Sequence, residues 1–393
     1  QNGAGLYDYI AQMPLDAQGT NAWLLPGISS STASKGTIAQ TPKMISPYIT
    51  WEKVDNANLG FDLMLFKNRL SITADLYQRT TRDMIGPAES IPSISGIASE
   101  DRAKVNNATL RNRGWELSVS WNDKLKCGFS YGVGFNVFNY KAVVTKYNNP
   151  EGIIYNNHTG LAANKGYYEG MDLGEIWGYR ADDLFLSNRE IDDYLRKVDL
   201  TAFKSNDLWR RGDLKYIDTN GDGRVDGGKG TLSDHGDLQV IGNTTPKYSF
   251  GINLNLGYKG FEVSTLLQGV AKRDFPIAGS NYMFGGNNYN FKEHLDYFST
   301  ENPNGYLPRL TGWKDDKDFL VNTGYNTTRY LLNAAYMRMK NLTVAYTFNK
   351  KQLKHIGISN LKVYVTCDNL FTITKLPKQF DPETLNQVNM SAG

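Results

Sequence analysis

The sequence has no long apolar run, few cysteines and few histidines. Its mean hydropathy is −0.47, and no stretch approaches the roughly 18–20 consecutive apolar residues that a membrane-spanning helix needs, which excludes a helical membrane protein. The two cysteines, Cys127 and Cys367, lie far apart in the sequence, in separate strand-like segments, and each is in phase with apolar neighbours. We therefore expect two small apolar side chains rather than a disulfide. The four histidines show no metal-ligand spacing.

A strong net charge and catalytic motifs are absent as well. The formal net charge is +3 and the basic residues are scattered, so nothing indicates binding to nucleic acid or a polybasic membrane anchor. The sequence contains no G-x-S-x-G, H-E-x-x-H or P-loop motif and no paired histidine and cysteine, whereas catalysis needs converging groups of this kind. Adjacent aspartates such as Asp192 and Asp193 are typical of solvated loops. We therefore predict that the protein is not an enzyme.

What the sequence does contain is alternation with a period of two. Leu59, Phe61, Leu63 and Leu65 share one face of a strand while Asp62 lies on the other. Segments of about ten alternating residues, joined by tight turns at one end and long loops at the other, are typical of a transmembrane β-barrel. Five pairs of segments are expected, the third of them weaker than the rest, at about 51–66 and 69–85, 111–123 and 126–141, 171–185 and 208–217, 246–258 and 261–275, and 335–348 and 360–374.

A soluble β-sandwich or solenoid would alternate in the same way. Aromatic side chains near strand ends favour the barrel, because aromatic belts form at membrane interfaces; they are Trp51, Trp121, Tyr258, Tyr346 and Phe348. The predicted fold class is therefore all-β, a transmembrane antiparallel β-barrel. The strands are too few to close a large barrel, and an open strand edge is costly in lipid. We expect partner strands in the same gene product or in another.

Long polar stretches separate the strand pairs. Residues 1–50 form a loop-rich segment, and residues 51–393 are expected to form barrel wall with long outer loops. Connections of this length count against a compact soluble domain but are expected on the outer side of a barrel. Within one of them, the spacing of Ile191 and Leu195 predicts a short helix over residues 187–196. The long stretches lie at about 86–110, 142–170, 186–207, 218–245 and 276–334.

One loop carries the pattern of a calcium site. In calcium-binding loops, positions 1, 3, 5 and 9 supply side-chain oxygens and position 7 supplies a backbone carbonyl; the corresponding residues are Asp218, Asn220, Asp222, Asp226 and, for the carbonyl, Arg224. Position 12 is Lys229 instead of a glutamate, which excludes a complete EF-hand, so Asp234 or Asp237 would have to complete the shell. The alternative is a polar turn, since Asn-Gly-Asp-Gly is also a strong turn sequence. We predict a structural Ca²⁺ ion in this loop.

Short motifs spread over nearly the whole chain go beyond alternation. They are Ser46-Pro-Tyr-Ile-Thr-Trp-Glu-Lys53, Asp75-Leu-Tyr77, Asn112-Arg-Gly-Trp-Glu116, Gly212-Asp-Leu-Lys-Tyr216, Val240-Ile-Gly-Asn-Thr-Thr-Pro-Lys-Tyr248, Tyr336-Met-Arg-Met-Lys-Asn-Leu342, Asp368-Asn-Leu-Phe371 and Asp381-Pro-Glu383. Each is weak alone, but as a set and in this order they resemble the SusC/RagA-type TonB-dependent transporters. The resemblance implies the carboxy-terminal part of a barrel of about 22 strands with a plug in its lumen, in the outer membrane of a Gram-negative bacterium. The plug, the TonB-contacting segment and the first barrel strands have no counterpart in this sequence.

The resemblance also implies a function, namely TonB-dependent active import of a bulky nutrient, an oligosaccharide or a peptide. It implies a SusD-like surface lipoprotein over the barrel mouth and, through the missing plug region, the TonB-ExbB-ExbD system. Aromatic rings stack on sugars, so five loop aromatics are candidate substrate contacts, with loop packing as the alternative for each: Trp177, Tyr179, Tyr282, Tyr289 and Trp313. The competing interpretations are a passive porin or surface-binding scaffold and a soluble, calcium-stabilised carbohydrate-binding module.

Overall fold

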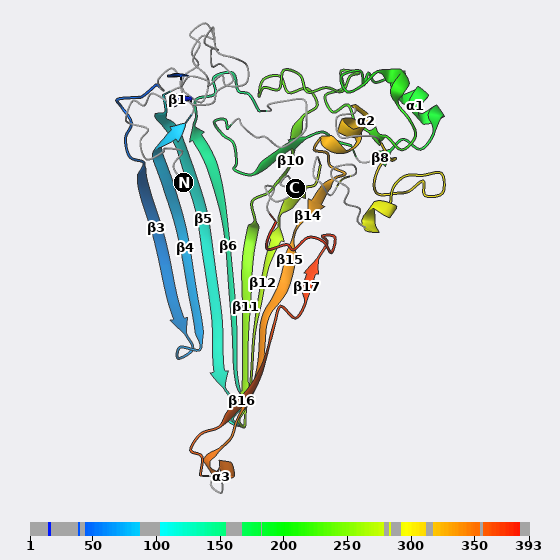
Figure 1. Cartoon of the computed structure of the whole chain (residues 1–393). Helices are drawn as coiled ribbons and strands as arrows, with labels where there is room; N and C mark the ends of the chain where they lie inside the picture. Colours follow the sequence, from blue (N-terminus) through cyan, green and yellow to red (C-terminus); the bar gives the residue numbers. More distant parts are fainter. Residues whose placement is uncertain are drawn as a thin grey trace, which may run out of the picture.

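Within the described residues of the computed structural model, nine strands form one antiparallel sheet along which the chain proceeds in order (Figure 1). The structure describes residues 15–16, 38–39, 44–86, 103–154, 167–181, 183–278, 283, 292–311, 317–353 and 357–385. The strands of this main sheet are β3 (Lys53–Leu65), β4 (Leu70–Gly86), β5 (Val105–Lys124), β6 (Ser130–Lys146), β11 (Lys247–Tyr258), β12 (Phe261–Lys272), β15 (Tyr336–Thr347), β16 (Lys362–Asp368) and β17 (Thr372–Thr374). Each strand of this order pairs with the one before it, except β17, which pairs with β15 as β16 does.

Helices are short and lie outside the sheet. They are α1 (Asn188–Leu195), α2 (Lys317–Phe319), α3 (Lys350–Leu353), the π-helical turn η5 (Leu320–Gly324) and the 3-10 turns η3 (Asn206–Leu208) and η4 (Lys292–Leu295). The expected helix over 187–196 is confirmed: the Ser187 side chain caps α1 by accepting a hydrogen bond from the Glu190 amide. Among the described residues, no helix has both the length and the apolarity that crossing a membrane requires.

The main sheet has one apolar and one polar face, and the strand register keeps each face intact from strand to strand. An apolar row runs across seven strands through Leu63, Ile72, Val119, Phe135, Ile252, Leu267 and Met339. The next row points to the opposite face, because successive side chains alternate, and consists of Asp62, Thr73, Ser118, Asn136, Gly251, Gln268 and Arg338. We call these two sides the apolar face and the polar face. This arrangement confirms the alternation on which the barrel prediction rests.

The two ends of the sheet differ. At the turn end, drawn at the bottom of Figure 1, short connections join β3 to β4, β5 to β6 and β11 to β12, and the connection from β15 to β16 carries α3. At the opposite, loop end, long segments leave the sheet. The β11–β12 turn consists of Lys259 and Gly260, both with positive φ (46° and 93°), which is the backbone of a type I′ hairpin and matches the twist of the flanking strands.

Aromatic side chains form a belt along the turn end of the sheet. Their ring centroids lie 5.9 Å apart for Phe66 and Trp121, 6.4 Å for Phe129 and Tyr258, and 4.6 Å for Phe261 and Tyr346. Near the loop end, Trp115 and Tyr248 approach to 6.5 Å. Tyr248 and Tyr258 are ten positions apart in β11, or about 33 Å along the strand. At a tilt of about 40°, this is the roughly 25 Å height of the apolar band of an outer-membrane barrel.

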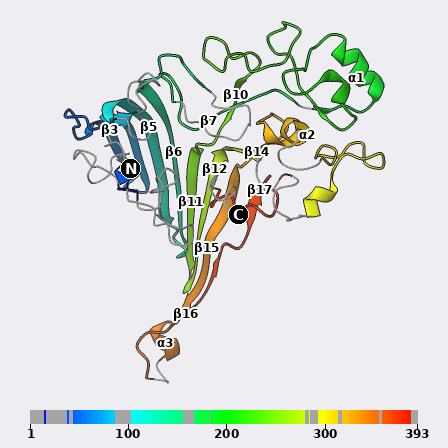
Figure 2. The same ribbon diagram turned by 45° about the horizontal axis from the view of Figure 1, so that its top comes forward.

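The connections from β6 to β11 and from β12 to β15 fold together into a loop domain, which we define as the described residues of 147–246 and 273–335. It gathers beyond the loop end of β11, β12 and β15 (Figures 1 and 2). Its small sheets pair β7 (Glu175–Gly178) with β10 (Gln239–Asn243), β8 (Asp183–Leu184) with β9 (Leu214–Lys215), and β13 (Asp274–Pro276) with β14 (Leu331–Asn333). A further pair, β1 (Leu15–Asp16) with β2 (Ile38–Ala39), lies in the segment 1–50.

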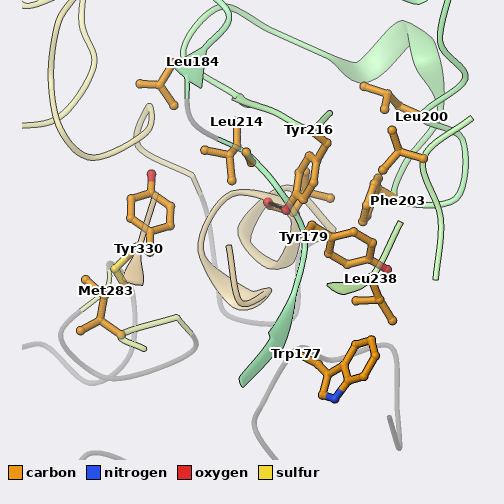
Figure 3. Packing of buried hydrophobic residues seen from close by; sticks show 14 of the residues in the cluster. Trp177, Tyr179, Leu184, Leu200, Phe203, Leu214, Tyr216, Leu238, Met283 and Tyr330 are labelled. Carbon is orange, nitrogen blue, oxygen red and sulfur yellow. Dashed lines mark hydrogen bonds between the residues drawn. The ribbon is translucent and has the colours of Figure 1, made fainter. Parts of the chain in front are cut away.

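The loop domain has a hydrophobic core of its own. Phe203 and Tyr216 stack with ring centroids 4.3 Å apart, and Tyr179 meets both rings edge to face (Figure 3). Residues of the core come from both connections, as Tyr330 and Met283 show together with Leu214 and Leu238 (Figure 3). Burying aromatic rings of this size contributes strongly to stability. The long outer connections are therefore folded structure over much of their length.

Two expectations need correction. Four of the five strand pairs occur as predicted, but the segments 171–185 and 208–217 add no strands to the main sheet; they contribute only β7, β8 and β9 to the small sheets. Their apolar residues lie in the loop-domain core, so burial, and not contact with lipid, explains the pattern. Cys127 lies in the turn between β5 and β6 and not in a strand, and both Cys127 and Cys367 are exposed and free.

Candidate functional site

The polar face of the main sheet is a wall of small and amide-bearing side chains. Cross-strand hydrogen bonds order it: Thr73 donates to Asp62 at 2.7 Å, and Asn341 donates to Asp368 at 2.8 Å. Towards the turn end this face is hollowed into a concavity of about 690 Å³. Its lining is polar and charged and includes Asn122, Asn255, Ser264, Thr343, Lys67 and Lys362. Such a wall suits a water-filled or polar lumen.

A cluster of two buried and two partly buried charges holds the two halves of the loop domain together. The Lys204 ammonium is fully buried and donates to Asp213 at 2.7 Å and to Asp318 at 2.6 Å. Arg309 bonds the same two carboxylates, at 2.5 Å and 2.6 Å. The Asn322 amide completes the cluster by donating to Asp213. Two cations and two anions balance, which is the condition under which buried charge is tolerated.

The electrostatics of this cluster favour its charged form. Burial opposes ionisation of the Asp318 carboxyl, but the hydrogen bonds and charges of Lys204 and Arg309 outweigh it and hold the pKa of Asp318 below its ordinary value. Burial lowers the pKa of Arg309, yet the carboxylates of Asp213 and Asp318 raise it overall. Asp318 and Arg309 therefore stabilise each other as an ion pair within this cluster.

A carboxy-terminal strap, residues 375–385, ties the loop domain to the main sheet. Arg338 on the polar face donates to Asp381 at 2.9 Å and to Glu383 at 2.7 Å, and Lys340 reaches Glu383 at 2.9 Å. Leu376 in the strap is buried in the loop-domain core. The strap therefore connects barrel wall, core and loop domain in one structure.

In the predicted calcium loop, the side-chain oxygens mostly bond to the loop's own backbone. The Asp218 carboxylate accepts from the amides of Gly221 and Gly223, at 2.6 Å and 2.8 Å. Asp222 accepts from the Arg224 amide, and Asp226 faces the Arg224 guanidinium at 3.0 Å. Among the described residues, no three acidic, histidine or cysteine side chains converge as a metal site. The predicted Ca²⁺ ion thus stays a prediction.

Asp237, one of the two residues considered for completing the calcium shell, makes several contacts with the loop backbone. Its side chain is buried and accepts hydrogen bonds from the Thr219 amide at 2.6 Å and from the Asp226 amide at 3.0 Å. Because both carboxylate oxygens serve the loop backbone, Asp237 shapes the turn. A depression of about 550 Å³ lies beside it, lined by Asn220, Asp222, Asp226, Asp234 and His235 among others.

The structure places two of the five candidate substrate contacts. Trp177 and Tyr179 are 8% and 7% exposed and lie in the loop-domain core. The Trp177 indole donates to the Tyr168 hydroxyl at 3.3 Å. Tyr282, Tyr289 and Trp313 lie outside the described residues. The structure thus brings Trp177 and Tyr179 together beneath the surface of the loop domain.

The charged cluster was not identified as a site from the sequence, although a signal was present in the motif Gly212-Asp-Leu-Lys-Tyr216. Gly212 has a φ of 85°, and Phe298 leaves no room for a side chain there. Asp213 follows as the centre of the cluster, and the Tyr216 hydroxyl donates to the Val321 carbonyl at 2.5 Å. The motif therefore encodes the junction between the two halves of the loop domain.

The two-faced sheet, its aromatic belts and its folded outer loops agree with a comparison of the sequence with known families. A family model described as TonB dependent receptor-like, beta-barrel matches residues 7–370. The chain belongs to this TonB-dependent receptor family. Proteins of the family are receptors and transporters, not enzymes, and they reside in the outer membrane of Gram-negative bacteria, where this chain is accordingly placed. This placement argues against the soluble-module interpretation.

Curated relatives agree with the family. The chain is 25% identical over 338 residues to TonB-dependent receptor P3 of Formosa agariphila, covering 85% of this chain and 31% of the relative. It is 22% identical over 354 residues to TonB-dependent receptor SusC of Bacteroides thetaiotaomicron, covering 88% and 31%. The chain thus spans about a third of the length of the relatives it matches.

Solved structures confirm the fold. The chain superimposes on a chain of the structure of the RagAB peptide transporter with a TM-score of 0.64 at 21% identity, covering 98% of this chain and 37% of that one. The RagAB peptide importer in its open-open state gives a TM-score of 0.64 at 20% identity. The fold is therefore part of a TonB-dependent barrel, as the sequence resemblance implied.

Proposed function

We propose that this chain forms the carboxy-terminal wall and part of the outer mouth of an energised importer, which takes up a bulky nutrient through the TonB-ExbB-ExbD system. The observation that carries the proposal is the family match over residues 7–370. The polar face, with its concavity of about 690 Å³, supplies a lumen-facing surface, and the apolar face supplies contact with lipid.

We further propose that the importer acts with a SusD-like surface lipoprotein and carries an oligosaccharide or a peptide. Support comes from the similarity to SusC and to the RagAB peptide transporter. The loop domain also supports the proposal, because a rigid folded surface at the mouth, locked by the Lys204 cluster, is better suited to hold a partner than free loops are.

The five loop aromatics take two roles in this proposal. Tyr282, Tyr289 and Trp313 are proposed to stack directly on the cargo. Trp177 and Tyr179, which are buried, are proposed to support the cargo-facing surface from beneath. A substitution of the first group would weaken uptake with the fold unchanged, whereas substituting the second would also loosen the loop domain.

The decisive experiment is uptake by cells expressing the full-length protein that contains this chain. Labelled oligosaccharide and peptide mixtures are offered to cells with and without a functional TonB, and the proteins that copurify with the detergent-solubilised receptor are identified by mass spectrometry. Saturable uptake that requires TonB, together with a copurifying lipoprotein, is the expected result. Uptake that persists without TonB would support a passive porin instead. Binding without any uptake would support a surface scaffold.

A further inference from the structure

The turn end of the sheet carries lysines at positions where the local backbone does not require lysine. Lys126, Lys259 and Lys350 come from three different connections, between β5 and β6, between β11 and β12, and between β15 and β16. All three are exposed, and none forms an ion pair with a described residue. We call them the rim lysines.

Two acidic groups near this end already form ion pairs. Asp123 pairs with Arg69 at 3.1 Å, and Glu262 pairs with Lys362 at 2.6 Å. Both pairs involve residues that line the concavity of the polar face. The charge of the rim lysines is therefore not compensated by these neighbours, and it is available to an outside partner.

Two rim lysines occupy places where another residue would fold more easily. Lys259 has a φ of 46° at the first position of a type I′ turn, where asparagine is strongly preferred because it tolerates this conformation. Lys350 begins α3, whose first turn contains no acidic residue, although the helix dipole favours negative charge at this end. Conformational preference therefore does not account for lysine at either position.

Each rim lysine lies within three positions of an aromatic residue of the turn end: Phe129 for Lys126, Tyr258 for Lys259 and Phe348 for Lys350. The Lys259 ammonium is 5.0 Å from the centre of the Tyr258 ring, and Tyr258 pairs in register with Phe261, whose ring packs against Tyr346. Aromatic belts sit at the level of lipid headgroups. Cations at the edge of the belt consequently lie near the level of the lipid phosphates.

We infer that the rim lysines bind the phosphates of anionic phospholipids in the leaflet that faces the turn end, which is the periplasmic leaflet for a barrel with short periplasmic turns. Each lysine near an anionic lipid surface increases the preference for anionic over neutral lipid about fivefold. The inference concerns how the barrel is held in its membrane. It rests on the outer-membrane placement and not on the proposed cargo, so uptake and lipid preference can fail independently.

The test uses the full-length receptor in neutral detergent with equal amounts of phosphatidylglycerol and phosphatidylcholine, and native mass spectrometry counts the bound lipids. The wild type is expected to retain phosphatidylglycerol preferentially. The triple variant K126Q/K259N/K350Q is expected to lose that preference by about fivefold for each lysine removed. Since asparagine suits the turn better than lysine does, K259N should fold at least as well as the wild type.

Two matched variants separate charge from other effects. The variant K126R/K259R/K350R keeps the charge and should keep the preference. The variant K197Q/K375Q/K378Q removes three exposed lysines outside the turn end and should behave as the wild type. The inference is overturned if the wild type shows no preference, or if the rim and control variants lose it equally. If the lipid preference is absent and a carbodiimide cross-links the rim lysines to a protein carboxylate in cells, the inference is also overturned, because the lysines then bind a protein instead of lipid.

Discussion

Lys204 is a central residue of the loop domain. It is 1% exposed, its ammonium bonds two carboxylates, and it lies 4.6 Å from the centre of the Trp209 ring. Lys204→Met would leave the buried Asp213 carboxylate and the partly exposed Asp318 carboxylate with only Arg309 between them. Removing one partner of a buried ion pair costs about 3–5 kcal/mol, so we expect hydrogen exchange in residues 199–215 and 317–323 to accelerate by at least a hundredfold. The exposed Lys197→Met is the control, and equal effects of the two variants would contradict this role.

Acid should open the same cluster. The pKa of Asp318 is held below its ordinary value by Lys204 and Arg309 against the opposing effect of burial. A carboxyl whose pKa is lowered by folding contributes its full stabilisation above its unfolded pKa of about 3.9 and loses it as pH falls through the folded pKa. Brief digestion of the full-length receptor by pepsin should therefore spare residues 199–215 at pH 4 and cut them at lower pH. Asp318→Asn should be cut already at pH 4, while the exposed Asp192→Asn should match the wild type.

Melting temperatures can separate a bound Ca²⁺ ion from the backbone hydrogen bonds that Asp237 accepts. A bound ion raises stability by mass action, so millimolar Ca²⁺ should raise the melting temperature of the full-length receptor, and Asp222→Ala, which removes the side-chain oxygens at position 5, should abolish this response. Asp237→Asn should lower the melting temperature with or without Ca²⁺, because its carboxylate serves the amides of Thr219 and Asp226. If neither Ca²⁺ nor a chelator changes the melting temperature of the wild type, the loop is a polar turn and not a calcium site.

At the scale of elements, the strands were predictable and the loop domain was not. Alternation along one segment suffices for a strand, as for β11, predicted at 246–258 and observed at Lys247–Tyr258. The loop-domain core joins residues far apart in sequence, such as Leu214 and the Asn322 side chain that bonds its amide. No periodic pattern within one segment of the sequence indicates such a contact. For the same reason, the sequence alone does not show that the candidate substrate contacts Trp177 and Tyr179 are buried.

The carboxy-terminal strap gives an element-scale prediction. Glu383 accepts from both Arg338 and Lys340, and its side chain is 22% exposed, so partial solvation weakens the pairing. Hydrogen bonds between charged groups are worth about 1.5–3 kcal/mol, and we expect Glu383→Gln to cost about 1–2 kcal/mol locally. Hydrogen exchange over residues 376–385 should accelerate about 5- to 30-fold. Glu301→Gln, an exposed change in the loop domain, is the control and should leave the strap unchanged.

At the scale of the whole molecule, two faces in register define the solvent on each side of the wall. Leu254 on the apolar face pairs in register with Val133, while the next residue, Asn255, lines the concavity of the polar face. The two positions share one strand and nearly one depth in the membrane. They differ only in the side to which they point.

This pair of neighbours tests the assignment of the faces directly. Leu254→Arg would place a charge in lipid, where arginine near the midplane costs about 2–4 kcal/mol. Asn255→Arg would place the same charge in the polar concavity, where room exists, and should cost less than about 1 kcal/mol. Urea titration of the full-length receptor folded into phosphatidylcholine vesicles, followed by its heat-modifiable gel shift, measures both. Equal costs would mean that the sheet does not separate lipid from lumen. The reverse order would mean that the face taken here for the lumen is the one that meets the membrane.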